Sequence, residues 1–403
     1  MATVQRVRFG DGRRDTYTVV GEDALPIPQA REYLRFLSDG GASPHTVRGY
    51  AYGLAEWWTL LTAVGAPWDD FPTSLFGQFL TYLRTGDLPA DARIGPAEQK
   101  LATSSVQQRA AAVLSMYRYH ADAHHVDAPY DRLFTSRGRW RRQHRYVGFL
   151  DGVGPQQHGD HPIYRTRTPN RSTTPVLLPG QVNTILDACA TQDDNGAWLG
   201  SPSGLRNRLL FAALAETGMR LGEALSLRHN DIRIGGGETP SIEVVERQDH
   251  PHGVRVKTGS RRIYVGDDLA ALYSEYVWQL VDLAADVTVA DLPTHFVFVN
   301  ITHGPRFAPM RPETVYEKVR SIKRAHPGTV PPDWTPHWLR HTHATALLLA
   351  GVAPHVVMRR LGHADVQTTL STYGWVTQEA EMRSLAEWKN FTAGWKGLTD
   401  AQQ

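Results

Sequence analysis

The first third of the chain has a helical pattern, because apolar residues recur at steps of three and four positions. Ser43-Pro44 supplies a helix N-cap followed by proline at the first helical position. One buried helix face is then predicted from Val47, Tyr50, Leu54, Trp57, Trp58 and Leu61. The Trp57-Trp58 pair could serve as a platform for base stacking, but its spacing favours a place in the core.

Other elements of this region follow from the same spacing. Further helices are predicted at Pro28–Leu37, Thr73–Leu83 and Ser104–Ala123, and a possible strand at Thr16–Val20. Four or five short helices packed together form a small all-α domain.

Helical spacing returns after residue 176 and is interrupted once. Helices are predicted at Pro179–Ala190, Gly204–Glu216, Leu221–Leu227, Leu269–Leu283, Arg311–Ala325, Pro336–Ala350, Pro354–Leu361 and about Gln378–Phe391. In between, apolar residues alternate as they do in strands, at Ile242, Val244, Val254, Val256, Ile263 and Val265, with a turn at Thr258-Gly259-Ser260. The expected fold class is therefore mainly α with a small antiparallel β-sheet, the sheet belonging to an α+β second domain.

The chain of 403 residues is too long for one ordinary core, so several segments are expected. We place an N-terminal extension at 1–22, the helical domain at 23–127, a linker at 128–175 and the second domain at 176–403. The linker lacks periodicity and is basic: residues 132–171 contain nine arginines and only two acidic residues, Asp151 and Asp160. Such a segment can follow a phosphate backbone, although a solvated flexible linker has the same composition.

Overall composition narrows the class of protein. The net charge of +2 does not by itself indicate nucleic-acid binding. Cys189 is the only cysteine, which excludes an intramolecular disulfide, and its apolar helical context predicts a core residue. No apolar stretch approaches the 18 or so residues of a membrane span, and no signal peptide is evident. We expect a soluble cytoplasmic protein with no membrane partner.

Several residues of the second domain suit chemistry on a phosphodiester. Arginine binds two phosphate oxygens with its planar fork, and Arg220 follows the turn residue Gly218 and precedes Glu223, which could orient it. Arg340 lies three residues after His337, so both face one side of a helix that starts near Pro336. The positive end of the helix dipole should disfavour the imidazolium form of His337.

Three further candidates have less distinctive surroundings. His363 follows Gly362, where a helix is predicted to end, and Tyr373 lies ten residues later. Tyrosine has a pKa near 10, so it needs cations and a proton acceptor to act as a nucleophile. Lys257 is one of only six lysines against 37 arginines, and an ammonium can protonate a leaving oxygen. Each of these residues taken alone is more often a packing residue or a residue at the solvent-exposed surface.

A metal site is not expected. His337 and His341 have the spacing of two ligands on one helix, but a zinc-protease motif needs glutamate at Trp338. Among 18 histidines such a pair is weak evidence. No phosphate-binding loop or acidic metal cluster is apparent either, so neither a metal nor a nucleotide cofactor is predicted.

The combination of these residues with their flanking sequences is more specific than any one of them. The motifs are ETGMRLGEALSL (216–227), HWLRHTHAT (337–345) and LGHADVQTTLSTYGW (361–375). Together they resemble the tyrosine recombinase (phage integrase) family over residues 176–395. SPHTVRGYAYGL (43–54) is similar to the opening of the family's SAM-like core-binding domain.

The resemblance implies a metal- and ATP-independent recombinase that cuts and rejoins DNA through a 3′-phosphotyrosine. Tyr373 would be the nucleophile, Arg220 and Arg340 the phosphate clamp, and Lys257 the general acid. The remaining roles would be proton transfer by His337, a phosphate hydrogen bond from His363 and support of Arg220 by Glu223. Candidate DNA contacts are Arg48, Arg109, Arg139, Arg141, Arg142 and Arg145.

The resemblance also implies partners: double-stranded DNA with specific core sites, a homotetramer on two such sites, and possible accessory proteins, acting at the bacterial nucleoid. The tail after Tyr373 would dock on its own or a neighbouring protomer. Three departures stand out: the ten-residue step from His363 to Tyr373 is one longer than usual, the linker is long, and residues 1–22 are too few for an arm-binding domain. Alternatives are a type IB topoisomerase and a catalytically inactive DNA-binding accessory protein.

Overall fold

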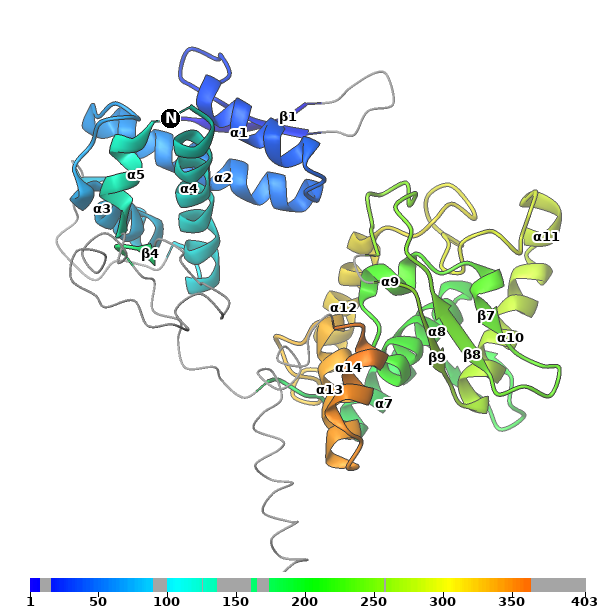
Figure 1. The fold of residues 1–403 in the computed structure, drawn as a ribbon. Helices are drawn as coiled ribbons and strands as arrows, with labels where there is room; N and C mark the ends of the chain where they lie inside the picture. Colours follow the sequence, from blue (N-terminus) through cyan, green and yellow to red (C-terminus); the bar gives the residue numbers. More distant parts are fainter. Residues whose placement is uncertain are drawn as a thin grey trace, which may run out of the picture. The chain divides into compact units, whose positions relative to one another are not determined.

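The computed structural model describes residues 1–7, 16–89, 100–124, 126–135, 161–164, 174–256 and 259–363. The chain divides into two compact units, unit 1 from Met1 to Asn170 and unit 2 from Arg171 to Gln403 (Figure 1). Each unit is described by itself. The turn at 258, the helix predicted near Gln378–Phe391 and most of the basic linker lie outside the described residues.

Unit 1 is a helical domain with a β-hairpin. Its helices are α1 (Pro28–Asp39), α2 (Pro44–Val64), α3 (Thr73–Thr85), α4 (Thr103–His124) and α5 (Asp127–Leu133). Strands β1 (Thr3–Val7) and β2 (Thr16–Val20) pair antiparallel, as do the short β3 (Phe134–Thr135) and β4 (His161–Pro162). The hairpin and α5 pack on the helices through Val19 and Leu133, so the packed unit includes segments on both sides of the predicted helical domain.

Trp57 lies at the centre of unit 1. Its side chain is fully buried, and its ring meets those of Phe71, Phe76 and Phe79 edge-on. Its Nε1 donates a hydrogen bond of 2.9 Å to the hydroxyl of Tyr117. Burial with a satisfied indole nitrogen confirms the core interpretation of this tryptophan and excludes a base-stacking platform.

Unit 2 is mainly helical around one central helix. Its helices are α7 (Pro179–Asp187), α8 (Pro202–Thr217), α9 (Leu221–Leu225), α10 (Asp267–Asp282), α11 (Ala285–Thr288), α12 (Pro312–Ala325), α13 (Pro336–Leu349) and α14 (Pro354–Leu361). Helix α8 packs against α7, α10 and α13, and buries residues on most of its circumference, including Leu210 and Phe211. Within the described residues, none of the helices has the length and apolar character needed to cross a membrane.

The sheet of unit 2 has three antiparallel strands in the order β7 (Ile232–Arg233), β8 (Ser241–Val244) and β9 (Arg261–Tyr264). A separate two-stranded pair joins β5 (Thr191–Gln192) to β6 (Trp198–Leu199). The expected fold class, mainly α with a small antiparallel sheet, is confirmed.

One predicted strand is wrong. Val254 and Val256 are buried, but the described chain around them is irregular and pairs with no strand of the sheet. The two residues are buried by different neighbours: a Cβ atom added at Gly222 of α9 would lie 3.2 Å from Val254 Cγ1, whereas Val256 packs with Val244 of β8 and Ile263 of β9. The strand that completes the sheet is the two-residue β7, which is too short to give a period in sequence.

Candidate active site

Arg220 and Glu223 form a rigid pair at the start of α9. Gly218 ends α8 with φ +65°, which turns the chain so that Arg220 becomes the N-cap residue of α9. Glu223 accepts hydrogen bonds from the backbone nitrogen of Arg220 at 2.8 Å and from its Nη1 at 3.0 Å. The Glu223 side chain is 1% exposed and that of Arg220 is 35% exposed, so a buried carboxylate orients an accessible guanidinium.

Gly218 serves this turn in a second way. A Cβ atom there would lie 2.7 Å from Cδ2 of His343 and 2.8 Å from Cδ2 of Leu361, distances shorter than van der Waals contact. Two helices therefore close directly over the turn that presents Arg220. The position needs glycine both for its positive φ and for this close approach.

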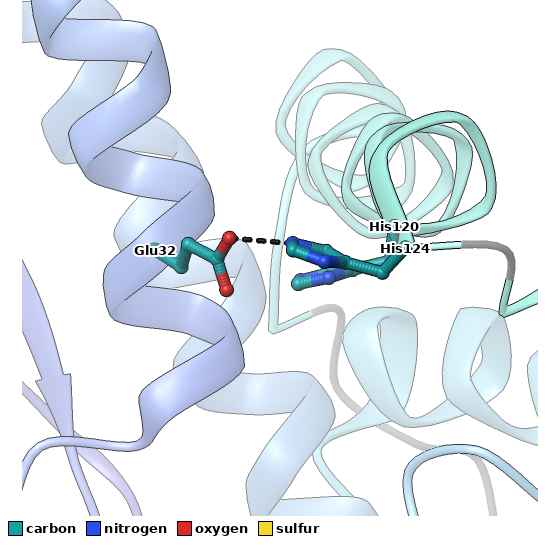
Figure 2. Close-up of side chains that lie close together, drawn as sticks. All are labelled: Glu32, His120 and His124. Atoms are coloured by element: carbon teal, nitrogen blue, oxygen red, sulfur yellow. Dashed lines mark hydrogen bonds and ion pairs between the residues drawn. The ribbon is translucent and has the colours of Figure 1, made fainter.

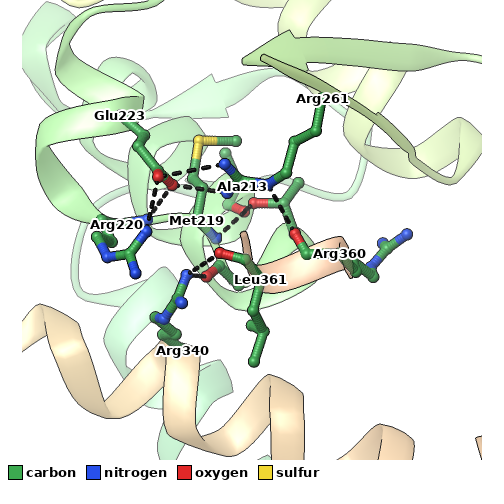
Figure 3. Close-up of polar contacts among 10 residues, drawn as sticks. Ala213, Met219, Arg220, Glu223, Arg261, Arg340, Arg360 and Leu361 are labelled. Atoms are coloured by element: carbon green, nitrogen blue, oxygen red, sulfur yellow. Dashed lines mark hydrogen bonds and ion pairs between the residues drawn. The ribbon is translucent and has the colours of Figure 1, made fainter. Parts of the chain in front are cut away.

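Arg261, a residue that sequence reasoning did not select, joins three elements of the site. From β9 its Nη2 donates to Glu223 Oε2 at 2.7 Å and its Nη1 to Oε1 at 3.2 Å. Its Nε donates to the backbone oxygen of Arg360, at the end of α14, at 2.9 Å. Figure 3 shows this guanidinium between the carboxylate of Glu223 and α14. Arg261 thus ties the strand that follows Lys257 to α9 and α14.

Arg340 is fixed by main-chain carbonyl groups. Its Nη1 donates to the oxygen of Gly218 at 2.8 Å and to the oxygen of Leu361 at 2.9 Å, and the residue is 2% exposed. Helix α13 carries it from an N-terminus formed by Thr335 and Pro336. The carbonyls hold the guanidinium where the turn before α9 meets the end of α14 (Figure 3).

His337 lies one turn before Arg340 on α13. Its side chain is open to solvent on one side. The pKa of His337 is lowered by desolvation from the surrounding protein, and then by the positive charges of Arg340 and Arg220. The ring centroids of His337 and His341 lie 4.4 Å apart, with the rings edge to face. These causes favour a neutral imidazole, which can accept a proton.

His363 follows Gly362, which ends α14 in the left-handed conformation with φ +69°. Desolvation, followed by the charges of Arg340, Arg220 and Arg261, lowers the pKa of His363 to about 4. The imidazole is therefore neutral near pH 7 and can donate a hydrogen bond without adding charge.

His343 and Arg360 support the site through hydrogen bonds between its elements, and sequence reasoning selected neither residue. Nε of Arg360 donates to Nε2 of His343 at 3.0 Å, and Nδ1 of His343 lies 3.1 Å from the oxygen of Ala215. Arg360 also donates to the backbone oxygens of Glu216 and Tyr264. Helices α8, α13 and α14 and strand β9 are thereby linked through polar contacts.

Apart from Arg48 and Arg109 of unit 1, the predicted site residues divide into two groups. Four catalytic candidates and their supporting carboxylate come together in unit 2: Arg220, His337, Arg340, His363 and Glu223. The other candidates lie outside the described residues: Lys257, Tyr373, Arg139, Arg141, Arg142 and Arg145.

The two candidate DNA contacts in unit 1 flank one aromatic ring. The guanidinium carbon of Arg48 lies 5.7 Å and that of Arg109 5.2 Å from the centroid of Tyr52. Arg48 is exposed, whereas Arg109 is 18% exposed and lies 3.0 Å from Glu56 Oε1. Arg48 is therefore the more accessible of the two for a phosphate.

Sequence comparison identifies both units. Residues 175–379 match the Phage integrase family, and residues 30–124 match the Phage integrase N-terminal SAM-like domain. The chain belongs to the phage integrase family. It is a tyrosine-type site-specific DNA recombinase.

Relatives of this recombinase align with nearly the whole chain or with part of it. Transposase A from transposon Tn554 of Staphylococcus aureus is 26% identical over 375 residues, which cover 92% of this chain and 93% of the relative. Tyrosine recombinase XerC of a Methylobacterium species is 32% identical over 164 residues, 41% of this chain and 44% of the relative.

Solved structures agree in fold. The XerH site-specific recombinase, bound to a palindromic difH substrate, aligns with TM-score 0.55 at 17% identity and covers 89% of this chain and 84% of its own. The integrase of transposon Tn1549, in complex with transposon right end DNA, aligns with TM-score 0.55 at 17% identity, over 89% of this chain and 100% of the other.

Proposed function

We propose that this recombinase cleaves and rejoins double-stranded DNA at specific core sites through a 3′-phosphotyrosine on Tyr373. The observation that carries the proposal is the meeting of Arg220 and Arg340, with neutral His337 and His363, around the turn at Gly218. Two fixed cations beside two uncharged imidazoles suit a phosphodiester that must be attacked without a metal.

Each residue then has a role in one displacement at phosphorus. Arg220 and Arg340 bind the non-bridging oxygens and stabilise the charge of the pentavalent transition state. The hydroxyl oxygen of Tyr373 bonds to phosphorus as the bond to the 5′ oxygen breaks, and its proton passes to His337. Lys257 donates a proton to the leaving 5′ oxygen, and His363 donates a hydrogen bond to the phosphate.

The step is reversible because the phosphotyrosine ester replaces the phosphodiester bond one for one. A 5′ hydroxyl from a second strand can attack the ester and give its proton to Lys257, while His337 returns a proton to Tyr373 and a phosphodiester is restored. Strand exchange therefore needs neither a nucleotide nor a metal, only a second DNA end in the same site.

Glu223 and Arg261 act through Arg220. Because the Glu223 carboxylate is buried and bonded to both arginines, it holds Arg220 in one orientation while the guanidinium stays accessible. Arg261 belongs to β9, which follows Lys257 in the sequence, so the same carboxylate also bonds to the strand that comes next after the lysine.

The proposed partner is duplex DNA. Both solved relatives are complexes with DNA, XerH with a difH substrate and the Tn1549 integrase with a transposon end. In unit 1 the exposed Arg48 beside Tyr52 would contact the backbone, with Arg109 supporting that ring. The arginines of the basic segment, Arg139, Arg141, Arg142 and Arg145, would add further phosphate contacts.

The proposal extends to the assembly and the place of action. Exchange of two duplexes requires four cleavages, one for each protomer of a homotetramer on two core sites, with accessory proteins where the sites need architecture. The reaction would take place on cytoplasmic DNA at the nucleoid. The match to a transposon transposase over nearly its whole length favours movement of a mobile element as the biological role.

Covalent trapping tests the proposal. The full chain is incubated with nicked duplexes made from the DNA that flanks its own gene, so that the short 5′-hydroxyl strand diffuses away after cleavage. Wild type should form a denaturation-resistant protein–DNA adduct without a divalent metal, and Tyr373→Phe should form none. An adduct with Tyr373→Phe refutes the assigned nucleophile.

The same substrates separate the alternatives. An inactive accessory protein would bind the duplexes but yield no adduct with wild type. A type IB topoisomerase would relax supercoiled plasmid that lacks paired sites, whereas the recombinase should require two sites. Relaxation by a monomer without those sites would overturn the recombinase mechanism.

A further inference from the structure

Two histidines and a glutamate meet on the surface of unit 1, whereas the residues discussed for catalysis belong to unit 2. His120 and His124 lie one turn apart on α4, and Glu32 faces them from α1 (Figure 2). One ligand atom from each of the three lies within 4.8 Å of the other two. Imidazole nitrogens and a carboxylate oxygen are the donor set of zinc and its neighbours among the divalent transition metals.

Contacts around the cluster hold its members in place. Nε2 of His124 lies 2.6 Å from Oε1 of Glu32, and the hydroxyl of Tyr119 donates to the same oxygen at 3.1 Å. Nε2 of His120 lies 3.2 Å from the backbone oxygen of Gln29, one turn before Glu32 on α1. Surrounding polar groups that orient the ligands are typical of metal sites in proteins.

The three residues differ in solvent exposure, and this difference suits a metal site. His120 is 2% exposed and is held against Trp68, with 5.2 Å between ring centroids. The side chains of Glu32 and His124 are 46% and 45% exposed. One ligand is therefore fixed in the core while two stay open to solvent, which gives an ion both an anchor and a route of entry.

The distances between the three ligand atoms are close to those found around a bound zinc ion. Zinc bonds of about 2.0–2.2 Å in a tetrahedral site place neighbouring ligand atoms about 3.3 Å apart. The His124–Glu32 separation of 2.6 Å is shorter than this and the farthest pair is within 4.8 Å, so small side-chain rotations suffice.

We propose that Glu32, His120 and His124 form a structural site for Zn²⁺ or a similar divalent transition metal ion, which fastens α1 to the end of α4. The fourth ligand would be water, since the cluster opens to solvent. A site of this kind goes beyond the proposed recombination chemistry, which needs no metal and lies in unit 2.

The sequence did not indicate this site, because its third ligand comes from a helix far along the chain. His120 and His124 have the same four-residue spacing as His337 and His341, and 18 histidines make such pairs common. Only the packing of α1 against α4 adds a carboxylate to the first pair.

Metal titration of the full chain, free of purification tags and stripped with chelator, tests the site. Zn²⁺ is followed by calorimetry, and Co²⁺ by its visible absorption, which reports nitrogen and oxygen ligation. Two variants remove exposed ligands: His124→Ala, and Glu32→Gln, which keeps the side-chain shape. His303→Ala, at an exposed histidine of unit 2, is the matched control.

Wild type and His303→Ala should bind one equivalent of Zn²⁺ and melt at a higher temperature with zinc than without it, because an ion that binds only the native state stabilises it. His124→Ala and Glu32→Gln should each bind at least about tenfold more weakly, since even outer contacts of a metal site contribute that much. Absence of stoichiometric binding in wild type overturns the proposal. Equal affinity in wild type and both ligand variants overturns it too, because the ion would then lie elsewhere and Glu32 and His124 would form a simple ion pair.

Discussion

Replacing Glu223 by glutamine should destabilise unit 2 and slow cleavage. Both oxygens of this carboxylate accept hydrogen bonds, from Arg220 at 2.8 and 3.0 Å and from Arg261 at 2.7 and 3.2 Å. Glutamine has nearly the same shape, but its NH₂ group donates instead of accepting. One side of the new amide would therefore face guanidinium N–H groups with nothing to accept them.

The free energy of unfolding that Glu223→Gln loses can be divided between the two arginines. Arg261 is 7% exposed, and removing one partner of a buried ion pair costs about 3–5 kcal/mol. Arg220 is 35% exposed and can turn to solvent, so its share is about 0–1 kcal/mol. Together the two shares amount to about 3–6 kcal/mol, so at about 2–4 °C per kcal/mol for a domain of this size the expected fall in the melting temperature is roughly 6–24 °C.

Thermal unfolding by circular dichroism measures this fall, with Glu313→Gln as control because it removes an exposed carboxylate in the first turn of α12. Below the melting temperature, adduct formation by Glu223→Gln should be at least about tenfold slower, equivalent to about 1.4 kcal/mol of lost transition-state stabilisation. Equal melting temperatures for the two variants would refute the reasoning, since the buried carboxylate would then contribute no more than a surface one.

Three further outcomes are expected. Gly362→Ala should destabilise unit 2 more than Gly351→Ala. Both glycines have positive φ, where a side chain costs about 1–2 kcal/mol, but only at Gly362 would the new Cβ lie 2.7 Å from a guanidinium nitrogen of β9. The difference between the melting curves of the two variants isolates the cost of that clash. Burial, with the charge of Arg360, lowers the pKa of His343 to about 4 from an unfolded value near 6.5. The stability that this histidine contributes is therefore present above pH 6.5 and is lost as the pH falls toward 4. Melting temperatures across this range should fall less steeply in His343→Gln than in wild type. Ser43→Ala should cost unit 1 about 1 kcal/mol in denaturant unfolding, because Ser43 Oγ accepts the backbone N–H at the start of α2.

Local chemistry explains which elements could be predicted from the sequence. Helix α14 runs over the predicted Pro354–Leu361, because proline sets its first turn and Gly362 its end. Helix α2 begins at Pro44 for the same reason, with Ser43 as its cap. Such boundaries are set by one or two residues, so they can be recognised without knowledge of the fold.

Long-range contacts explain what could not be predicted. Arg261 looked like one more arginine in an arginine-rich chain, and only the packing of β9 against α9 and α14 brings it to Glu223. The burial of Val254 and Val256 depends on α9 and on the sheet respectively, so alternation alone gave a strand where the described chain has none. The supporting pair His343 and Arg360 was missed for the same reason as Arg261.

The manner in which Arg340 is held has a consequence for synthesis of the protein. Its guanidinium bonds to Gly218, which lies 122 residues earlier in the chain, and to Leu361, which lies 21 residues later. A nascent polypeptide that has released the Arg220 turn but not α14 cannot hold this arginine in place. Because such distant contacts form late, Arg340 is held by both carbonyls only after α14 has emerged from the ribosome, and a product that ends before α14 lacks the carbonyl of Leu361.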